Sequence, residues 1–276
     1  MAVKLLFIHA LTSIHPGTGQ GVGTIDLPIA RERATNLPII PGSTLKGCLK
    51  ARFEDGERKD EAFGKSDAQG KLRFSDARLL LLPVRCAGST FVWATCPYVL
   101  RRFQRDCDLL AAAVPPREIP APGDEVADMI DKSAAIALEE GKPRLVLEDL
   151  DFKIREALAK EWAEWIADLL FPDDEPWRKE FLKRFAILSD GNFDYLCEFA
   201  TEVNAHIAIG KSGTAEAQAL WYEETLPAET VLVALVEEMG AVQASEIVPH
   251  PRVLRLGGNE TTGQGLARLA LSGGPA

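Results

Sequence analysis

The chain has 276 residues, of which 46% are hydrophobic and 26% are charged, a composition typical of a globular protein with a sizeable core. No run of about 18 apolar residues is present and the five cysteines form no CxxC pair, which argues against a membrane span, a zinc ribbon and a disulfide framework and favours a reduced, cytoplasmic protein. The net charge of −10 argues against nucleic-acid binding if it is spread evenly over the surface.

The first part of the chain departs from this acidic average. Residues 1–53 carry a net charge of +4, residues 244–276 carry +1, and the stretch between them therefore carries −15. Such an asymmetry allows a local positive surface at the two ends of the chain, and phosphate contacts depend on local field.

The chain begins with a predicted strand and a glycine-rich loop. Residues 3–14 are partly alternating and partly continuously apolar, which predicts a strand. The loop at 15–23, HPGTGQGVG, has glycine at every second position, a spacing that does not match the dinucleotide-binding fingerprint.

Two residues of this region are candidates for chemistry. Asp26 follows the glycine-rich loop and His15 opens it. A carboxylate in this position could hold a divalent ion, or help to deprotonate a ribose 2′-hydroxyl in RNA cleavage. The alternatives are a turn carboxylate and a structural histidine. Since the sequence has no HExxH or HxxE motif, any metal at Asp26 would be weakly held or shared with RNA.

A helix is predicted at about residues 43–54. Ser43 follows Pro41 and Gly42 and is suited to be the N-cap. Lys46 and Lys50 are four residues apart, so both lie on one helix face, where they could contact RNA phosphates. The opposite face is apolar, with Leu45, Cys48, Leu49 and Phe53 at helical spacing. The alternative is an ordinary solvated surface helix.

The middle of the chain contains predicted strands followed by predicted helices, in alternation. We expect strands at 72–84, 89–96 and 144–152, and helices at 97–113, 155–170 and 192–200. The stretch 114–125 holds four prolines and is predicted to be a loop.

The last third of the chain combines strands with glycine loops. Residues 201–210 and 217–224 are predicted to form a hairpin across KSGTAE, and 229–238, 252–258 and 266–272 are further strand segments. The GKS at 210–212 lacks the glycine that a P-loop requires five residues earlier. The loop in 256–268 is either a simple hairpin loop or a backbone segment that a ligand approaches closely.

Strands and helices interleave without a regular βαβ repeat. The order favours an α+β protein with a modified ferredoxin-like (βαββαβ) core carrying insertions.

Six segments follow one another in an order that resembles a known family. They are HPGTGQGVGTIDLPIARE, PIIPGSTLKG, LRFSDARLLLLPVR, TFVWATCPYVLRRF, ALWYEETLP and GGNETTGQGLAR. Their combination is similar to the RAMP-type backbone subunit of type III-B CRISPR effectors, the Cmr complex, and spans residues 9–268.

The resemblance implies a single RAMP domain over residues 1–276. It would have a ferredoxin-like palm of the RNA-recognition-motif type, a helical insertion at about 97–200 and a β-hairpin thumb at about 203–220. The implied function is that of a subunit that forms a helical filament on the crRNA guide, together with other copies of itself and other subunits of the Cmr effector complex. It would cleave the bound complementary target RNA endonucleolytically, with magnesium or manganese as the divalent metal.

The resemblance also implies roles for individual residues. Asp26 matches the aspartate that supports metal-dependent cleavage, and Ser43, Lys46 and Lys50 match the helix along the guide backbone. The matching glycine-rich loop contains Gly257, Gly258, Gly263 and Gly265. We add Glu224 of the WYEE segment and His15 as candidate catalytic helpers, although nothing in the sequence places Glu224 near Asp26.

Two other functions remain open at this point. The chain could be a structural RNA-binding subunit of a CRISPR effector without chemistry of its own, because its acid–base residues are sparse. It could also be a crRNA-processing endoribonuclease of the same superfamily, which would have to cleave precursor RNA as an isolated protein.

Overall fold

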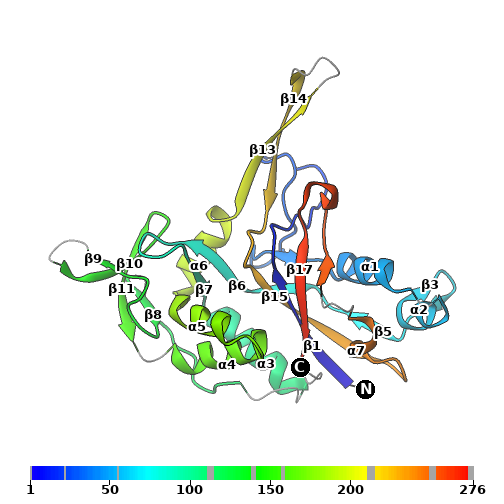
Figure 1. The fold of residues 1–276 in the computed structure, drawn as a ribbon, viewed down its shortest axis with the longest axis horizontal. Helices are drawn as coiled ribbons and strands as arrows, with labels where there is room; N and C mark the ends of the chain where they lie inside the picture. The colour runs from blue at the N-terminus through cyan, green and yellow to red at the C-terminus, as the bar shows by residue number, and fades with distance from the viewer. Residues whose placement is uncertain are drawn as a thin grey trace.

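The protein is built around one large mixed β-sheet, seen edge to edge across Figure 1. The structure is a computed structural model that describes residues 2–21, 23–54, 56–110, 115–137, 141–156, 159–209, 215–248 and 253–272. The strands of the sheet lie in the order β16 (Val253–Arg255), β17 (Leu266–Leu271), β1 (Ala2–Ala10), β15 (Val231–Glu238), β6 (Ala77–Arg85), β7 (Phe91–Thr95), β12 (Phe185–Ile187), β8 (Val126–Met129), β11 (Leu150–Glu156), β10 (Pro143–Leu147) and β9 (Ile136–Ala137). Two short strands join it from the side: β2 (Ile39–Ile40) pairs with β6, and β5 (Leu72–Phe74) pairs with β15.

Strand β1 is covered by buried side chains on both of its faces. It pairs antiparallel with β15 on one edge and with β17 on the other. Leu5 and Phe7 belong to one buried cluster, whereas Leu6, Ile8 and Ala10 belong to another. Because successive side chains of a strand point to opposite faces, the continuously apolar sequence of β1 follows from burial on both sides.

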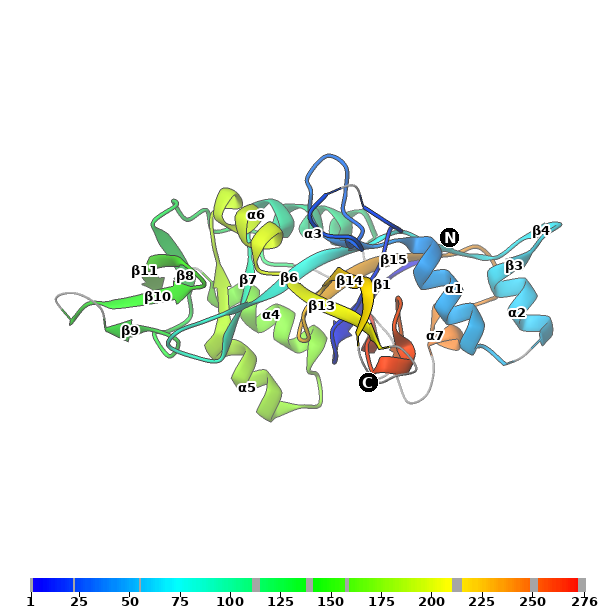
Figure 2. The same ribbon diagram turned by 90° about the horizontal axis from the view of Figure 1, so that it is seen from above.

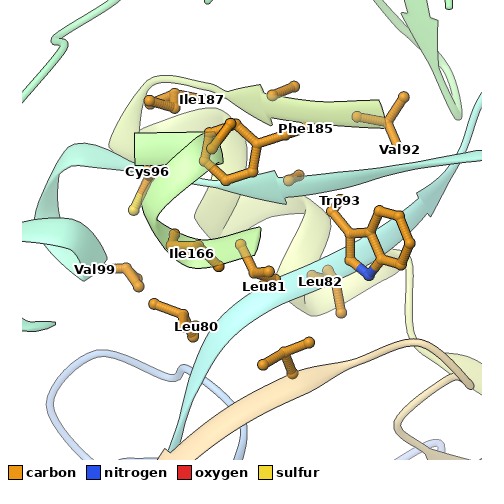
Figure 3. Packing of buried hydrophobic residues seen from close by; sticks show 14 of the residues in the cluster. Leu80, Leu81, Leu82, Val92, Trp93, Cys96, Val99, Ile166, Phe185 and Ile187 are labelled. Carbon is orange, nitrogen blue, oxygen red and sulfur yellow. The ribbon is translucent and has the colours of Figure 1, made fainter. Parts of the chain in front are cut away.

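The larger cluster packs the sheet against four helices. These are α3 (Pro97–Leu110), α4 (Lys160–Leu170), α5 (Glu175–Arg184) and α6 (Asp190–Phe199). Figure 3 shows side chains of β6, β7 and β12 packed against Val99 of α3 and Ile166 of α4. Trp93 of β7 is fully buried, and its ring centroid lies 5.1 Å from that of Phe181 in α5. Aromatic side chains each bury a large apolar area, so contacts of this kind stabilise the core strongly.

The smaller cluster holds the two ends of the chain together. It contains residues of β1, β15 and β17 and of three helices, namely α1 (Gly42–Arg52), α2 (Gly56–Phe63) and α7 (Ala244–Ile247). Leu45 and Leu49 are buried there, and Cys48 and Phe53 pack against the cluster, which confirms the apolar face predicted for this helix. A small hairpin, β3 (Gly64–Lys65) and β4 (Ala68–Gln69), follows α2.

A separate hairpin projects from the body of the molecule in Figure 1, and Figure 2 looks down on it from above. Its strands, β13 (Glu202–Ile209) and β14 (Ala215–Thr225), pair antiparallel with each other in a two-stranded sheet. This pairing agrees with the hairpin predicted from the sequence. The residues between the strands, 210–214, lie outside the described part of the chain.

The segment 97–200, predicted to be a helical insertion, holds helices α3 to α6 and several strands as well. Strands β8 to β12 lie in it and extend the main sheet. The strand expected at 144–152 is two strands, β10 and β11, joined by a turn in which Glu148 has a φ of +50°. The turn residues are Glu148 and Asp149, of which only the aspartate is of a type favoured in turns, so the signal for the turn is weak. Strand β11 then runs to Glu156, so the next helix begins at Lys160, later than expected.

Two further findings concern composition. Four of the five free cysteines are buried and Cys48 is partly buried, which confirms that they act as small hydrophobic residues. No helix among the described residues is long and apolar enough to cross a membrane.

Candidate functional site

The loop that follows β1 lies against the base of the hairpin. The backbone N–H of Leu27 donates to the carbonyl of Tyr222 at 3.0 Å, and the N–H of Glu224 donates to the carbonyl of Leu27 at 3.0 Å. Leu27 therefore forms an isolated parallel bridge to β14 at the base of the hairpin. This contact brings Asp26, the neighbour of Leu27, to a strand that lies far away in the sequence.

Asp26 is exposed, and one of its two carboxylate oxygens is held by the hairpin. Its Oδ2 accepts a hydrogen bond from the backbone N–H of Tyr222 at 2.8 Å. Among the described residues, Oδ1 has no hydrogen-bond partner. A carboxylate that is oriented through one oxygen and open at the other can offer that oxygen to a hard cation or to a substrate proton.

His15 lies beneath the same loop and is buried. Its Nδ1 is 2.7 Å from the carbonyl oxygen of Glu224. Because a carbonyl oxygen only accepts, Nδ1 carries the proton, and Nε2 of the neutral ring has the free lone pair. A Cβ atom on Gly17 would stand 2.4 Å from Nε2, so only glycine fits there. In the described part of the chain, no hydrogen bond joins His15 to Asp26.

Glu224 is buried, and its carboxylate holds the loop onto the hairpin. Its Oε2 accepts from the backbone N–H of Ile29 at 3.1 Å. Its Oε1 accepts from the Thr201 hydroxyl at 2.8 Å and pairs with the guanidinium of Arg31. Both oxygens are thus used inside the protein, which gives Glu224 a positioning role. Its catalytic role stays an untested prediction.

Glu223 lies on the opposite face of β14 and also holds a loop onto the hairpin. It was not predicted from the sequence as a site residue. It is buried, and it accepts a hydrogen bond from the side-chain amide of Asn259. The Nε2 of His206 lies 3.9 Å from Oε1 of Glu223, the same oxygen that Asn259 contacts. The His206 ring stacks on that of Trp221, with ring centroids 5.4 Å apart and an interplanar angle of 14°. The two consecutive glutamates therefore anchor both ends of the chain to the hairpin. Their adjacency on a strand, which sends them to opposite faces, was the available signal.

The C-terminal glycine loop packs directly on the N-terminal loop. The N–H of Gly258 donates to the carbonyl of His15 at 3.0 Å. Gly257 has a φ of +84°, and a Cβ atom there would stand 2.4 Å from the same carbonyl oxygen. The close backbone approach expected of this loop is thus made to the protein's own chain at Gly257.

Two further glycines of the loop have positive φ values. Gly265 (+83°) packs against the backbone of Leu256, whereas Gly263 (+93°) has open space where a Cβ would lie. The prediction that these glycines allow left-handed backbone is confirmed at both positions. Contacts of Gly257, Gly258, Gly263 and Gly265 with RNA stay predictions.

Helix α1 begins one residue before the position expected. Pro41 is its N-cap, and the N–H of Gly42 donates to the Asp76 carboxylate at 2.8 Å. The prediction of Ser43 as N-cap is therefore wrong, because a distant aspartate satisfies the helix terminus. Ser43 is exposed and Lys46 is half-buried. Lys50 donates from Nζ to the carbonyl of Gly64 at 2.6 Å and so fastens the β3–β4 hairpin to the helix.

The loop carrying Asp26 is also tied to the other half of the molecule. Arg102 of α3 makes two hydrogen bonds to the Glu32 carboxylate, at 2.6 and 2.7 Å. Burial raises the pKa of Glu32, but hydrogen bonds from Arg102 and Thr35 outweigh it and leave the pKa below its ordinary value.

The donor set for a metal is small. No group of three or more histidine, cysteine, aspartate or glutamate side chains that could hold an ion occurs among the described residues. Asp26 offers one open carboxylate oxygen, which fits a hard divalent cation as a single ligand.

Comparison with known proteins adds independent information. A model of the RAMP superfamily matches residues 7–268. The chain is 32% identical to the CRISPR system Cmr endoribonuclease Cmr4 of Pyrococcus furiosus, with 98% of this chain and 96% of the relative covered. It is 24% identical to the CRISPR system CMR subunit Cmr4 of Saccharolobus solfataricus, with 97% and 96% covered.

Solved structures are similar over the same length. Oligomeric Cmr4 from Pyrococcus furiosus has a TM-score of 0.75 at 26% identity, with 100% of both chains covered. A chain of the type III-B Cmr-beta complex bound to cognate target RNA has a TM-score of 0.76 at 20% identity, covering 99% of this chain and 98% of that one. The second similarity shows a shared fold.

Proposed function

The chain belongs to the RAMP superfamily, and from this premise we propose that it is a guide-RNA-binding backbone subunit of a type III-B CRISPR effector that cleaves bound target RNA. Its relative from Pyrococcus furiosus is named an endoribonuclease of the Cmr system and covers almost the whole chain. The observation that carries the catalytic part is the geometry of Asp26, one oxygen of which is fixed by Tyr222.

The palm proposed for this protein is a modified ferredoxin-like unit. Strands β17, β1, β15 and β6 are neighbours in that order and antiparallel throughout. Numbered along the chain they are strands four, one, three and two, with α1 after the first and α7 before the last. This arrangement supports a βαββαβ core interrupted by a long insertion.

The hairpin β13–β14 is the proposed thumb. One of its faces exposes large hydrophobic side chains, namely Val203, Ile207, Leu220 and Tyr222. An exposed apolar face on a projecting hairpin usually marks a contact surface. Its base is joined to the loop of Asp26, so a hairpin inserted in a guide–target duplex would bring that residue to the target strand.

The cleavage step proposed here uses the ribose of the target. The 2′-oxygen attacks the adjacent phosphorus as its proton is removed, and the bond from phosphorus to the 5′-oxygen breaks. The leaving 5′-oxygen takes up a proton from water, so the products are a cyclic phosphate and a 5′-hydroxyl. Asp26 would accept or orient the 2′-hydroxyl proton through Oδ1, while Tyr222 N–H holds Oδ2 in place. A magnesium or manganese ion bound by Asp26 and by RNA oxygens would supply positive charge near the phosphate.

RNA binding is proposed for the surface of α1 and the adjoining loops. Ser43 is exposed and Lys46 is only half-buried, so both can reach a phosphate backbone. The proposed partners are the crRNA guide, single-stranded target RNA, further copies of this chain and other Cmr subunits. Relatives solved as an oligomer and in a complex bound to target RNA support these partners.

The test replaces Asp26 by asparagine in the assembled complex and follows labelled target RNA in magnesium or manganese. Loss of the carboxylate should slow cleavage by about 10²–10⁴-fold, the usual effect of removing a general base. Binding of guide and target should persist, since the side-chain oxygen of an asparagine at this position can still accept from Tyr222 N–H. Undiminished cleavage at every site would refute the catalytic role.

A second candidate is a structural RNA-binding subunit without chemistry of its own. The observation that favours it is that His15 and Glu224 are both engaged within the protein. In that case the wild-type complex would bind target RNA and leave it intact in both metals.

A further inference from the structure

An open cavity is lined by residues of α1, the β3–β4 hairpin and β5. Figures 1 and 2 both show α1 and β3 beside α2, at one end of the molecule. The cavity has a volume of about 810 Å³, within the range of about 300–1,000 Å³ typical of ligand sites. Its lining comes from the first turns of α1, the β3–β4 hairpin and strand β5. Neither the proposed cleavage site nor the glycine loop contributes to it.

The wall formed by the β3–β4 hairpin is rigidly built. Gly64 has a φ of +80°, and a Cβ atom there would stand 2.5 Å from the backbone nitrogen of Gly70. A Cβ atom on Gly70 would in turn stand 2.4 Å from the backbone of Phe63. Lys50 of α1 holds the carbonyl of Gly64. The hairpin is therefore fixed to the helix, and the cavity between them has a defined shape.

The rim of the cavity is positive. Lys46, Lys65 and Arg73 line it, with Asp67 as the opposing charge. Arg73 lies 3.5 Å from Glu237 in an exposed ion pair, and pairs of this kind are weak. Within the described residues, Lys46 and Lys65 have no ion pair. The three cationic side chains outnumber the single carboxylate of the lining, so this part of a chain of net charge −10 is a local site for an anion.

The floor of the cavity is aromatic. Phe74 is half-buried and lines the cavity. Its ring is stacked on that of Phe63, with ring centroids 6.0 Å apart and an interplanar angle of 4°. The T-shaped contact of Phe53 with Phe63 supports the stack from behind. A firmly held aromatic face beside cationic side chains is the combination that single-stranded nucleic acids recognise, through base stacking and phosphate contacts.

We propose that this cavity binds one nucleotide of single-stranded RNA, with Lys46 and Lys65 contacting its phosphate and Phe74 supporting its ring. The inference rests on the proposed function, because it assigns a further contact to the same RNA. It extends the RNA surface from α1 to the β3–β4 hairpin. Lys50 acts on this surface as a positioning residue that fixes the hairpin carrying Lys65.

The first test compares Lys65→Glu with Lys71→Glu in the full-length protein. Both change an exposed lysine in the same segment, but Lys71 does not line the cavity. Binding of a labelled single-stranded oligouridylate is measured across a salt series. Lys65→Glu should weaken binding and flatten the dependence of log Kd on log salt by about 0.7, the value for one phosphate contact on a single strand. Lys71→Glu should retain the wild-type slope.

The second test locates the RNA on the protein. Oligouridylate carrying 4-thiouridine is cross-linked to the wild-type protein with ultraviolet light, and the modified peptide is identified by mass spectrometry. A cross-link within residues 63–74 is expected, and Phe74→Leu should reduce its yield while the fold is retained.

The outcomes separate the two levels of the proposal. RNA binding that Lys65→Glu leaves unchanged, with cross-links only elsewhere, would overturn the cavity assignment and leave the proposed function intact. A wild-type protein and complex that bind no RNA would overturn both. A Lys65→Glu variant that loses self-association but binds RNA normally would show that the cavity receives another copy of the chain.

Discussion

At the scale of residues, three carboxylates at the base of the hairpin have the same chemistry and different tasks. Glu224 has both oxygens occupied by donors of the protein, and Glu223 is buried against Asn259 and His206. Of the three, only Asp26 is exposed, and its Oδ1 has no hydrogen-bond partner among the described residues. The difference in solvent access, more than residue type, supports Asp26 as the catalytic candidate.

Replacing Glu224 by Gln should destabilise the protein. Arg31 and Glu224 have side-chain exposures of only 16% and 4%, so the change leaves a largely buried guanidinium without its counter-charge. We expect a loss of about 3 kcal/mol in the free energy of unfolding, measured with urea. Glu175→Gln in the exposed pair with Lys179 is the control and should change stability by less than about 0.5 kcal/mol. Equal effects of the two variants would contradict the positioning role.

Glu32 makes a pH-dependent contribution to stability. Its pKa is lowered in the folded protein by the hydrogen bonds from Arg102 and Thr35, against the effect of burial. The stabilisation is therefore complete above the ordinary glutamate pKa of about 4.3 and is lost as pH falls through the lower folded value. Urea unfolding of wild type and Glu32→Gln should differ by a constant amount at neutral pH and converge in acid. A difference that grows in acid would contradict this assignment.

At the scale of elements, the two terminal loops and the hairpin form one unit. β1 and β17 pair directly, the glycine loop packs on the backbone of His15, and Leu27 joins β14. These segments are thus joined by main-chain hydrogen bonds, which stabilise them together.

Gly257→Ala tests this unit. The new Cβ would lie 2.4 Å from the carbonyl oxygen of His15, at a φ of +84°. We expect a loss of about 3 kcal/mol or more, since backbone strain and a clash with backbone combine. Gly263→Ala is the matched control, because its φ of +93° is similar but its Cβ would have open space, so about 1–2 kcal/mol is expected. Thermal unfolding of both variants measures the difference, which should be absent if the two loops do not pack together.

At the scale of the whole molecule, charge is distributed unevenly. The stretch between residues 53 and 244 carries −15, while the N-terminal segment carries +4. The acidic stretch includes the whole segment that extends the sheet through strands β8 to β12. Copies of the chain therefore repel one another at long range, while the basic segment attracts RNA.

Self-association and RNA binding should respond to salt in opposite directions. Added sodium chloride screens the repulsion between copies and should strengthen self-association of the RNA-free protein. The same salt should weaken binding to single-stranded RNA through counterion release. Sedimentation velocity and fluorescence anisotropy over one salt series measure the two effects. Self-association that weakens with salt would instead show that copies meet through opposite charges.

Local patterns in the sequence determined much of the fold and part of the site. The apolar run of β1, the helical spacing of Leu45 and Leu49, and the two arms of the β13–β14 hairpin all follow from periodicity, which neighbouring residues determine. The proximity of Asp26 to a glycine-rich loop was likewise visible. Strands β8 and β12 were not predicted, because each is short and becomes a strand through pairing with distant partners.

Only the tertiary structure decided which polar groups are free. Asp76, and not Ser43, accepts from the backbone N–H at the start of α1. Lys50 donates to the carbonyl of Gly64. The carboxylate of Glu224 contacts Ile29 and Arg31. Each of these partners lies well outside the local segment of the residue it holds, and no periodicity encodes such a pairing. The sequence determines which side-chain groups are present. Their solvent access and hydrogen-bond partners depend on which distant segments the fold brings together.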